Sequence, residues 1–146
     1  MSDVVDAATR SRMMANIKGK DTSPELFLRR ALHARGFRYR LGGGLLPGRP
    51  DLIFPSRRVA VFIHGCFWHR HECSYFKWPK SNREFWQAKL EGNAARDTRV
   101  KSELTRMGWK VLTVWECELR RTRYALPNPA VSRVSRILAS RTSVPR

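Results

Sequence analysis

Residues 62–73 (FIHGCFWHRHEC) hold three of the four histidines of this chain and two of its three cysteines. Packing alone does not gather imidazoles and thiols at this density, whereas metal binding and acid–base catalysis use both kinds of side chain. The segment therefore predicts a metal site, a catalytic site, or both.

The cysteines and one histidine have the spacing of a zinc site. Cys66, His71 and Cys73 form a C-x4-H-x-C pattern, and Cys117 follows a later apolar segment. A Cys3His set binds Zn²⁺ tetrahedrally and leaves no open position, so such a site is structural. His69 competes with His71 as the histidine ligand, because both lie near the two cysteines in the sequence. The alternative is three unrelated buried cysteines and a surface histidine.

A carboxylate and two histidines have the chemistry to hydrolyse a phosphodiester. Asp51 begins one expected strand, His64 ends the next, and His69 follows five residues later. A carboxylate can hold Mg²⁺ against a phosphate, and a histidine can take a proton from water. Taken singly, Asp51 could cap a strand or pair with an arginine, and His64 could be structural. Their combination in a basic chain favours catalysis.

Large side chains beside these residues predict contact with bases. Phe67 and Trp68 are adjacent, and Trp86 follows in a polar helical segment. Aromatic rings next to Lys and Arg suit stacking on bases or wedging between them. Core packing is the alternative, although two consecutive rings are hard to bury together. Met14, in a basic N-terminal segment, is a second candidate wedge or a helix-packing residue.

Charge points to nucleic acid as the partner. The chain has 146 residues, with 29 Lys and Arg against 12 Asp and Glu, for a net charge of +17. Such a field attracts polyanions, of which nucleic acid is the commonest. We find neither an apolar run of membrane-spanning length nor a signal-peptide pattern, so we expect a cytoplasmic protein that binds no membrane.

Several helices and strands must position these residues. Ser23, Pro24 and Glu25 predict the start of a helix that ends near Gly36. The remaining pattern predicts strands at 37–41, 51–54, 59–63 and 109–115, an irregular segment at 64–80, and helices at 81–107 and 130–140. In the long helix, an inner face would contain Phe85, Leu90 and Leu104. We therefore expect a single α/β domain with a mixed central sheet flanked by helices.

Six segments carry a resemblance to a known family: ATRSRMM, DTSPE, LPGRPDLIF, VFIHGCFWHRHEC, EFWQAKLEGNAARD and GWKVLTVWEC. Over about residues 3–120, the chain resembles the very short patch repair (Vsr) endonucleases. These are bacterial DNA mismatch endonucleases related to the PD-(D/E)XK nuclease fold. The expected organisation is a DNA-binding segment at 1–22 that orders on DNA, an endonuclease domain at 23–123, and a C-terminal helix and basic tail at 124–146.

The resemblance implies a Mg²⁺-dependent nick on the 5′ side of the thymine in a T·G mismatch, which arises when 5-methylcytosine deaminates. The implied partner is duplex DNA with that mismatch, and mismatch-repair proteins are further candidates. A lone mismatch has no two-fold symmetry, so it suits a monomer. The competing hypotheses are a zinc-stabilised DNA-binding module without catalysis and a related nuclease with another DNA specificity.

The resemblance also implies a role for each matching residue. Asp51 and the backbone of Ile63 would bind Mg²⁺, His69 would be the general acid or base, Glu25 would orient it, and His64 would act on the phosphate or leaving group. The implied structural zinc ligands are Cys66, His71, Cys73 and Cys117, and the implied wedges are Phe67, Trp68, Trp86 and Met14.

The chain departs from the family pattern at two points. It has no E-x-K motif after Asp51, which the wider superfamily carries, and histidines replace that function. Ile63 stands where a relative has threonine. That change is tolerable if the metal contact is the backbone carbonyl, and it lowers metal affinity if the contact is the hydroxyl.

Overall fold

A mixed four-stranded sheet lies at the centre of the computed structural model, which describes residues 22–42, 46–69, 71, 73 and 76–141. The strand order is β1 (Arg40–Leu41), β2 (Leu52–Phe54), β3 (Val59–His64) and β4 (Lys110–Trp115). The first two pairings are antiparallel, and β3 pairs with β4 in parallel. This confirms the expected α/β fold with a mixed sheet, although the first strand is shorter than predicted.

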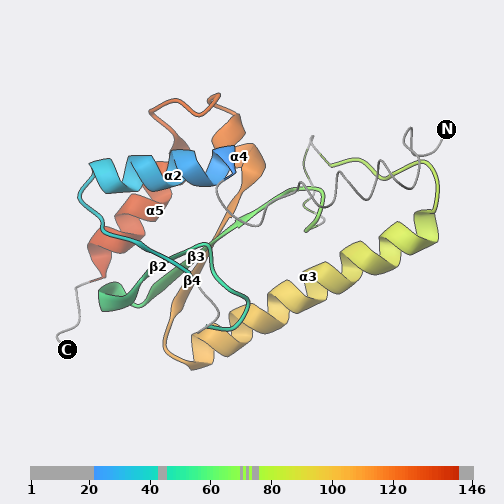
Figure 1. The fold of residues 1–146 in the computed structure, drawn as a ribbon, viewed down its shortest axis with the longest axis horizontal. Helices are drawn as coiled ribbons and strands as arrows, with labels where there is room; N and C mark the ends of the chain where they lie inside the picture. Colours follow the sequence, from blue (N-terminus) through green and yellow to red (C-terminus); the bar gives the residue numbers. More distant parts are fainter. Residues whose placement is uncertain (1–21, 43–45, 70, 72, 74–75, 142–146) are drawn as a thin grey trace.

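Helices cover both faces of the sheet (Figure 1). They are α2 (Ser23–Ala34), α3 (Arg83–Arg106), α4 (Glu116–Arg120) and α5 (Pro129–Ser140), with a 3-10 turn, η1 (Pro55–Arg57). Helices α2 and α5 pack on one face, and the long α3 crosses the other. The sequence did not predict α4. None of the helices in the described part of the chain is long and apolar enough to cross a membrane.

Local chemistry explains the ends of α2. The N-cap is Thr22, one residue before the predicted Ser23, because the Thr22 hydroxyl accepts the Glu25 amide at 3.4 Å. After the helix, Gly36 adopts φ +92°, the left-handed conformation that glycine tolerates best. The helix therefore starts and stops almost where its sequence signals lie, and it holds Glu25 on its buried side.

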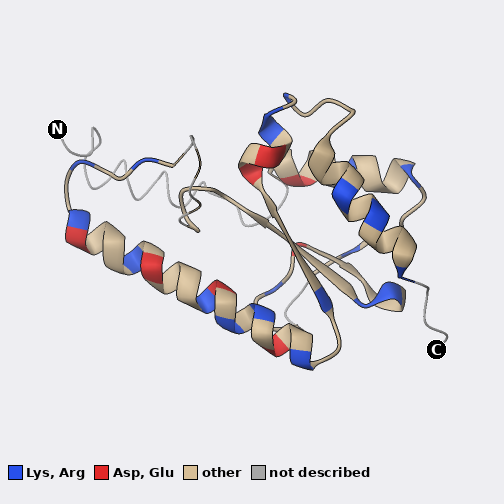
Figure 2. Ribbon diagram, turned by 180° about the vertical axis from the view of Figure 1, so that it is seen from behind, with Lys and Arg blue, Asp and Glu red and all other residues tan. Residues whose placement is uncertain are grey.

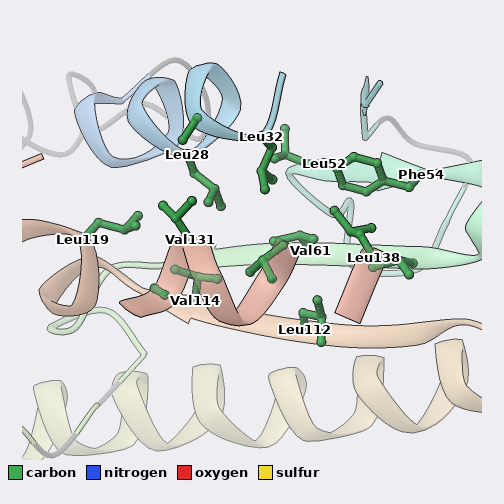
Figure 3. Close-up of a cluster of buried hydrophobic side chains, with 14 residues drawn as sticks. Leu28, Leu32, Leu52, Phe54, Val61, Leu112, Val114, Leu119, Val131 and Leu138 are labelled. Carbon is green, nitrogen blue, oxygen red and sulfur yellow. The ribbon is translucent and has the colours of Figure 1, made fainter. Parts of the chain in front are cut away.

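The main core lies between the sheet and helices α2 and α5 (Figure 3). Leu28 and Leu32 of α2 and Val131 of α5 meet Val61 and Val114 of the sheet, and all five side chains are fully buried. Helix α5 is therefore part of the same core as the sheet. Residues 1–21, which carry most of the predicted N-terminal DNA-binding segment, lie outside the described residues.

Helix α3 buries only a narrow stripe against the opposite face of the sheet. Trp86, Leu90 and Leu104 are its buried residues. The prediction for Leu90 and Leu104 is confirmed, whereas Phe85 is 56% exposed and Trp86 takes the inward position instead. The middle of the helix, between Leu90 and Leu104, lies across a cavity from residues of β3 and β4.

Strand pairing brings the predicted site residues to one edge of the sheet. His64 ends β3 opposite Trp115, which ends β4, because the two strands run in parallel. Strand β2 runs the other way, so Asp51, at its start, lies beside the end of β3. Cys117 follows in α4. The sheet therefore collects the acidic, histidine and cysteine side chains at its β3–β4 carboxyl end.

Candidate active site and metal cluster

Four side chains form the expected Cys3His cluster. One ligand atom from each of Cys66, His71, Cys73 and Cys117 lies within 4.8 Å of all the others. The Cys117 Sγ and His71 Nδ1 atoms are 3.6 Å apart. A tetrahedral Zn²⁺ with usual bond lengths separates a sulfur from a nitrogen ligand by about 3.6 Å. The arrangement is thus consistent with structural zinc, and His71, not His69, is the histidine within it.

Backbone hydrogen bonds and ring stacking hold this cluster. The His71 amide donates to the Cys66 carbonyl at 2.9 Å, which turns the chain tightly between two ligands. The Trp115 ring stacks on the His71 ring at a centroid distance of 4.0 Å and an interplanar angle of 8°. Burial raises the pKa of the Cys66 thiol to about 12, so a metal ion must displace a proton to bind there.

Asp51 lines a cleft of about 520 Å³ together with Glu25, His64 and His69. The Ile63 amide donates to Asp51 Oδ2 at 2.7 Å. Burial raises the pKa of Asp51 to about 6, the Ile63 hydrogen bond opposes that rise, and the Glu25 carboxylate adds to it. A buried carboxylate facing a second one is a site whose charge a divalent cation would offset.

The two predicted catalytic histidines stack face to face in this cleft. The His64 and His69 ring centroids are 3.8 Å apart, with an interplanar angle of 4°. Burial, together with the neighbouring His69, lowers the pKa of His64 to about 4, although Asp97 partly opposes both effects. At neutral pH His64 is therefore an uncharged imidazole.

Asp97 of α3 is a site residue that sequence reasoning missed. Its Oδ2 lies 2.5 Å from His69 Nδ1 and 3.9 Å from His64 Nδ1. Because a carboxylate oxygen accepts, His69 Nδ1 is the donor in this contact, and Nε2 is the ring nitrogen that Asp97 does not contact. A signal was available, since position 97 falls seven residues after Leu90 and seven before Leu104, on the same inner stripe of the helix.

Glu25 lies in the expected cleft, but the side chain that it contacts is Arg29. It is 2% exposed and lines the same cleft, but its Oε2 pairs with Arg29 Nη1 at 3.1 Å. The carboxylate at His69 Nδ1 is that of Asp97. The expected orientation of His69 by Glu25 therefore differs from the observed contacts, and a role for Glu25 in catalysis stays a prediction.

Three of the predicted wedge residues form one ring cluster beside the cleft. The Phe67 ring lies 5.4 Å from the Trp86 ring, and the Trp68 ring lies 5.9 Å from it. Phe67 and Trp68 are partly exposed, whereas Trp86 is only 6% exposed and packs against both of their rings. Met14, the fourth predicted wedge, lies outside the described residues.

The family follows from comparison with known proteins. The family model described as DNA mismatch endonuclease Vsr matches residues 2–75. DNA mismatch endonuclease Vsr of Escherichia coli strain K12 is 47% identical over 120 residues, covering 82% of this chain and 77% of that protein. This chain belongs to the Vsr family. It is a nicking endonuclease that acts on DNA, and its reaction is a hydrolysis.

Other relatives of this Vsr-family chain are named nicking enzymes. The type II nicking enzyme V.XorIIP of Xanthomonas oryzae pv. oryzae is 45% identical over 119 residues, covering 82% of this chain and 88% of that enzyme. The catalytic domain of the homing endonuclease I-Bth0305I has a TM-score of 0.55 at 18% identity, covering 82% of this chain and 97% of that domain. That structural likeness supports an endonuclease-like fold.

Proposed function

We propose that this enzyme nicks DNA on the 5′ side of the thymine in a T·G mismatch, and so starts very short patch repair. The observation that carries the proposal is a single cleft holding Asp51, His64 and the His69–Asp97 pair, with a ring cluster at its side. The relative from Escherichia coli, at 47% identity, is named a mismatch endonuclease. Other relatives are named nicking enzymes, so the mismatch and its flanking bases need a direct test.

His69 is the proposed general base. Its Nε2 takes a proton from the attacking water, and the Nδ1 proton stays in its hydrogen bond to Asp97 Oδ2. The carboxylate then stabilises the imidazolium that forms, as a carboxylate does in other catalytic pairs with histidine. His64 is uncharged and stacked on His69, so it serves the phosphate or the leaving oxygen as a hydrogen-bond donor.

Asp51 is the proposed Mg²⁺ ligand, together with the backbone carbonyl of Ile63. The two residues are adjacent in space, because the Ile63 amide donates to the Asp51 carboxylate. Oxygen ligands suit Mg²⁺, which would neutralise charge on the phosphate when bound. Glu25, buried in the same cleft, adds to the negative potential there. Under this assignment the side chain of Ile63 need not contribute a ligand.

Recognition of the mismatch is proposed to come from the rings and the protein charge. A mismatch is cheaper to unstack than a normal pair, so the insertion of Phe67 and Trp68 costs less free energy at a mismatch. This difference in cost favours binding at the mismatch. Trp86 supports both rings, which keeps the wedge from folding back on insertion. Basic residues lie along α3 and over the opposite end of the molecule (Figure 2), where they supply affinity without sequence information.

A panel of nicking substrates tests this proposal. Purified protein with Mg²⁺ is expected to nick the thymine strand of T·G duplexes and to leave duplexes with other mismatches and fully paired duplexes intact. Each substrate is labelled on both strands, so that the cut strand and position are read together, and flanking bases are varied. Equal nicking of paired and mismatched duplexes would reject mismatch specificity and favour a nuclease with another target.

Replacing Asp97 by asparagine is expected to lower the nicking rate by about 100-fold or more, because an amide cannot stabilise the imidazolium of His69. Single-turnover nicking of a T·G duplex measures the effect. The matched control is Glu103→Gln, which removes another carboxylate from α3. Asp97→Asn should keep its zinc content and its DNA affinity, so a loss of either would indicate a structural role.

A further inference from the structure

The catalytic histidines and Asp97 form a second cluster of donor atoms, separate from the cysteines. Nitrogen atoms of His64 and His69 and an oxygen of Asp97 all lie within 4.8 Å of one another. His64 is 8% exposed, and its Nδ1 has no hydrogen-bond partner among the described residues. That nitrogen faces the same Asp97 oxygen that His69 contacts, at 3.9 Å. A buried, unpaired donor atom aimed at a carboxylate is a position that a cation could satisfy.

The donor set is the wrong one for Mg²⁺ and a good one for borderline metals. Two imidazoles and one carboxylate suit Zn²⁺, Ni²⁺ or Cu²⁺, whereas Mg²⁺ prefers oxygen ligands alone. Three protein ligands with an open fourth position also differ from the closed Cys3His cluster, which has four. The second cluster should therefore bind Zn²⁺ more weakly than the first.

The distances require only a small rearrangement. Ligands of a tetrahedral Zn²⁺ with bonds of the usual length are about 3.3 Å apart. The observed separations from Asp97 Oδ2 are 2.5 Å to His69 Nδ1 and 3.9 Å to His64 Nδ1, which lie on either side of that value. A shift of the carboxylate towards His64 equalises them. The two parallel rings must also turn apart so that their lone pairs converge, and the proton on His69 Nδ1 must pass to Nε2 or to solvent.

Space for that rotation exists beside the rings. A cavity of about 260 Å³ lies between α3 and the ends of β3 and β4, and His64, His69 and Asp97 all line it. Its other walls include Phe62 and Trp115. This empty space adjoins both rings, so they have room to turn out of their stacked arrangement.

We propose that Zn²⁺ binds His64, His69 and Asp97 as a second, weaker site and inhibits nicking. The inhibition rests on the proposed function, because a metal on His69 and Asp97 occupies the base and the carboxylate that positions it. Metal binding itself does not rest on that function. Zinc would then stabilise the protein through one cluster and inhibit it through the other.

The test begins with full-length protein that carries one zinc per chain. Equilibrium dialysis against increasing Zn²⁺, followed by elemental analysis, is expected to show a second equivalent that binds as nicking activity falls. Co²⁺ in the second site should add a visible spectrum without the thiolate charge-transfer bands of the cysteine cluster. A chelator too weak to remove the first ion should restore nicking.

Variants assign the second ion to its ligands. His64→Ala and Asp97→Asn are expected to weaken the second site by about 100-fold or more and to retain the first zinc. The control is His33→Ala, since His33 is exposed on α2, remote from both clusters, and its loss should change neither site. Thermal unfolding of each variant shows that a lost site is not a lost fold.

The results separate the two proposals. Saturation of the unmodified protein at one zinc per chain would overturn the second site, as would a second ion that His64→Ala and Asp97→Asn both retain. Inhibition by Zn²⁺ without uptake of a second ion would also overturn it. A second ion bound by a protein that nicks no T·G duplex would leave the site standing and reject the proposed function.

Discussion

Asp51→Asn is expected to lower the nicking rate by about 1,000-fold or more, because the amide removes the negative charge that would hold Mg²⁺ against the phosphate. The substitution keeps the shape of the side chain, and its oxygen can still accept the Ile63 amide hydrogen bond. Binding to a T·G duplex should stay close to that of the unmodified protein, since the amide leaves Trp68, which lines the same cleft, in place. Single-turnover nicking and an equilibrium binding assay measure the two effects.

Stability provides the control for this prediction. Burial raises the pKa of Asp51 to about 6, which means that the folded protein disfavours the charged carboxylate. A neutral amide of the same shape should therefore leave the unfolding midpoint unchanged or raise it. Undiminished nicking by Asp51→Asn in Mg²⁺ would reject the assigned role, whereas a lower midpoint would make lost activity a folding effect.

Cys117→Ser is expected to lose zinc and to lower the unfolding midpoint by about 10 °C or more. Cys117 is 1% exposed and joins α4 to the irregular segment that carries the other three ligands. Removing one of four ligands opens a closed site, and structural zinc contributes directly to folding free energy. In a chain of this size, about 10 °C corresponds to a loss of about 3 kcal/mol. Elemental analysis and thermal unfolding, with and without a chelator, measure the change.

The histidines provide the matched control for zinc binding. All three cysteines belong to the cluster, so no cysteine in the chain can serve as a neutral substitution. His71→Gln should lose zinc as Cys117→Ser does, and His33→Gln should retain it. If Cys117→Ser kept one zinc per chain at full stability, the assigned ligand set would be wrong.

The choice between His69 and His71 shows where sequence reasoning stopped. The two histidines are two residues apart, and both lie near Cys66 and Cys73, so spacing left either of them open as a ligand. Tertiary structure separates them. The end of β4 places Trp115 against His71 and Cys117 next to it, while α3 brings Asp97 to His69. Both contacts come from residues far away in the sequence, so they could not be predicted from residues 62–73 alone.

The strands were easier to predict from the sequence than the inner face of α3. An uninterrupted apolar run predicted β3, and a mainly apolar segment predicted β4, each within about one residue of its observed bounds. The inner face of α3 was harder, since its sparse apolar residues allow more than one stripe. Trp86 is buried and Phe85 is exposed, the reverse of the expected packing. Asp97 lies on the stripe that Leu90 and Leu104 correctly predicted, but the sequence did not show that this stripe meets His69.

The whole of α3 lies between Cys73 and Cys117 along the chain. An ion shared by these residues would close a loop of about 45 residues and reduce the entropy of the unfolded chain by the equivalent of about 4 kcal/mol. Because α3 buries few side chains, it can open locally at modest cost while both of its ends stay tethered. Amide exchange along α3 should therefore report transient detachment of Asp97 from the histidines long before the metal cluster itself comes apart.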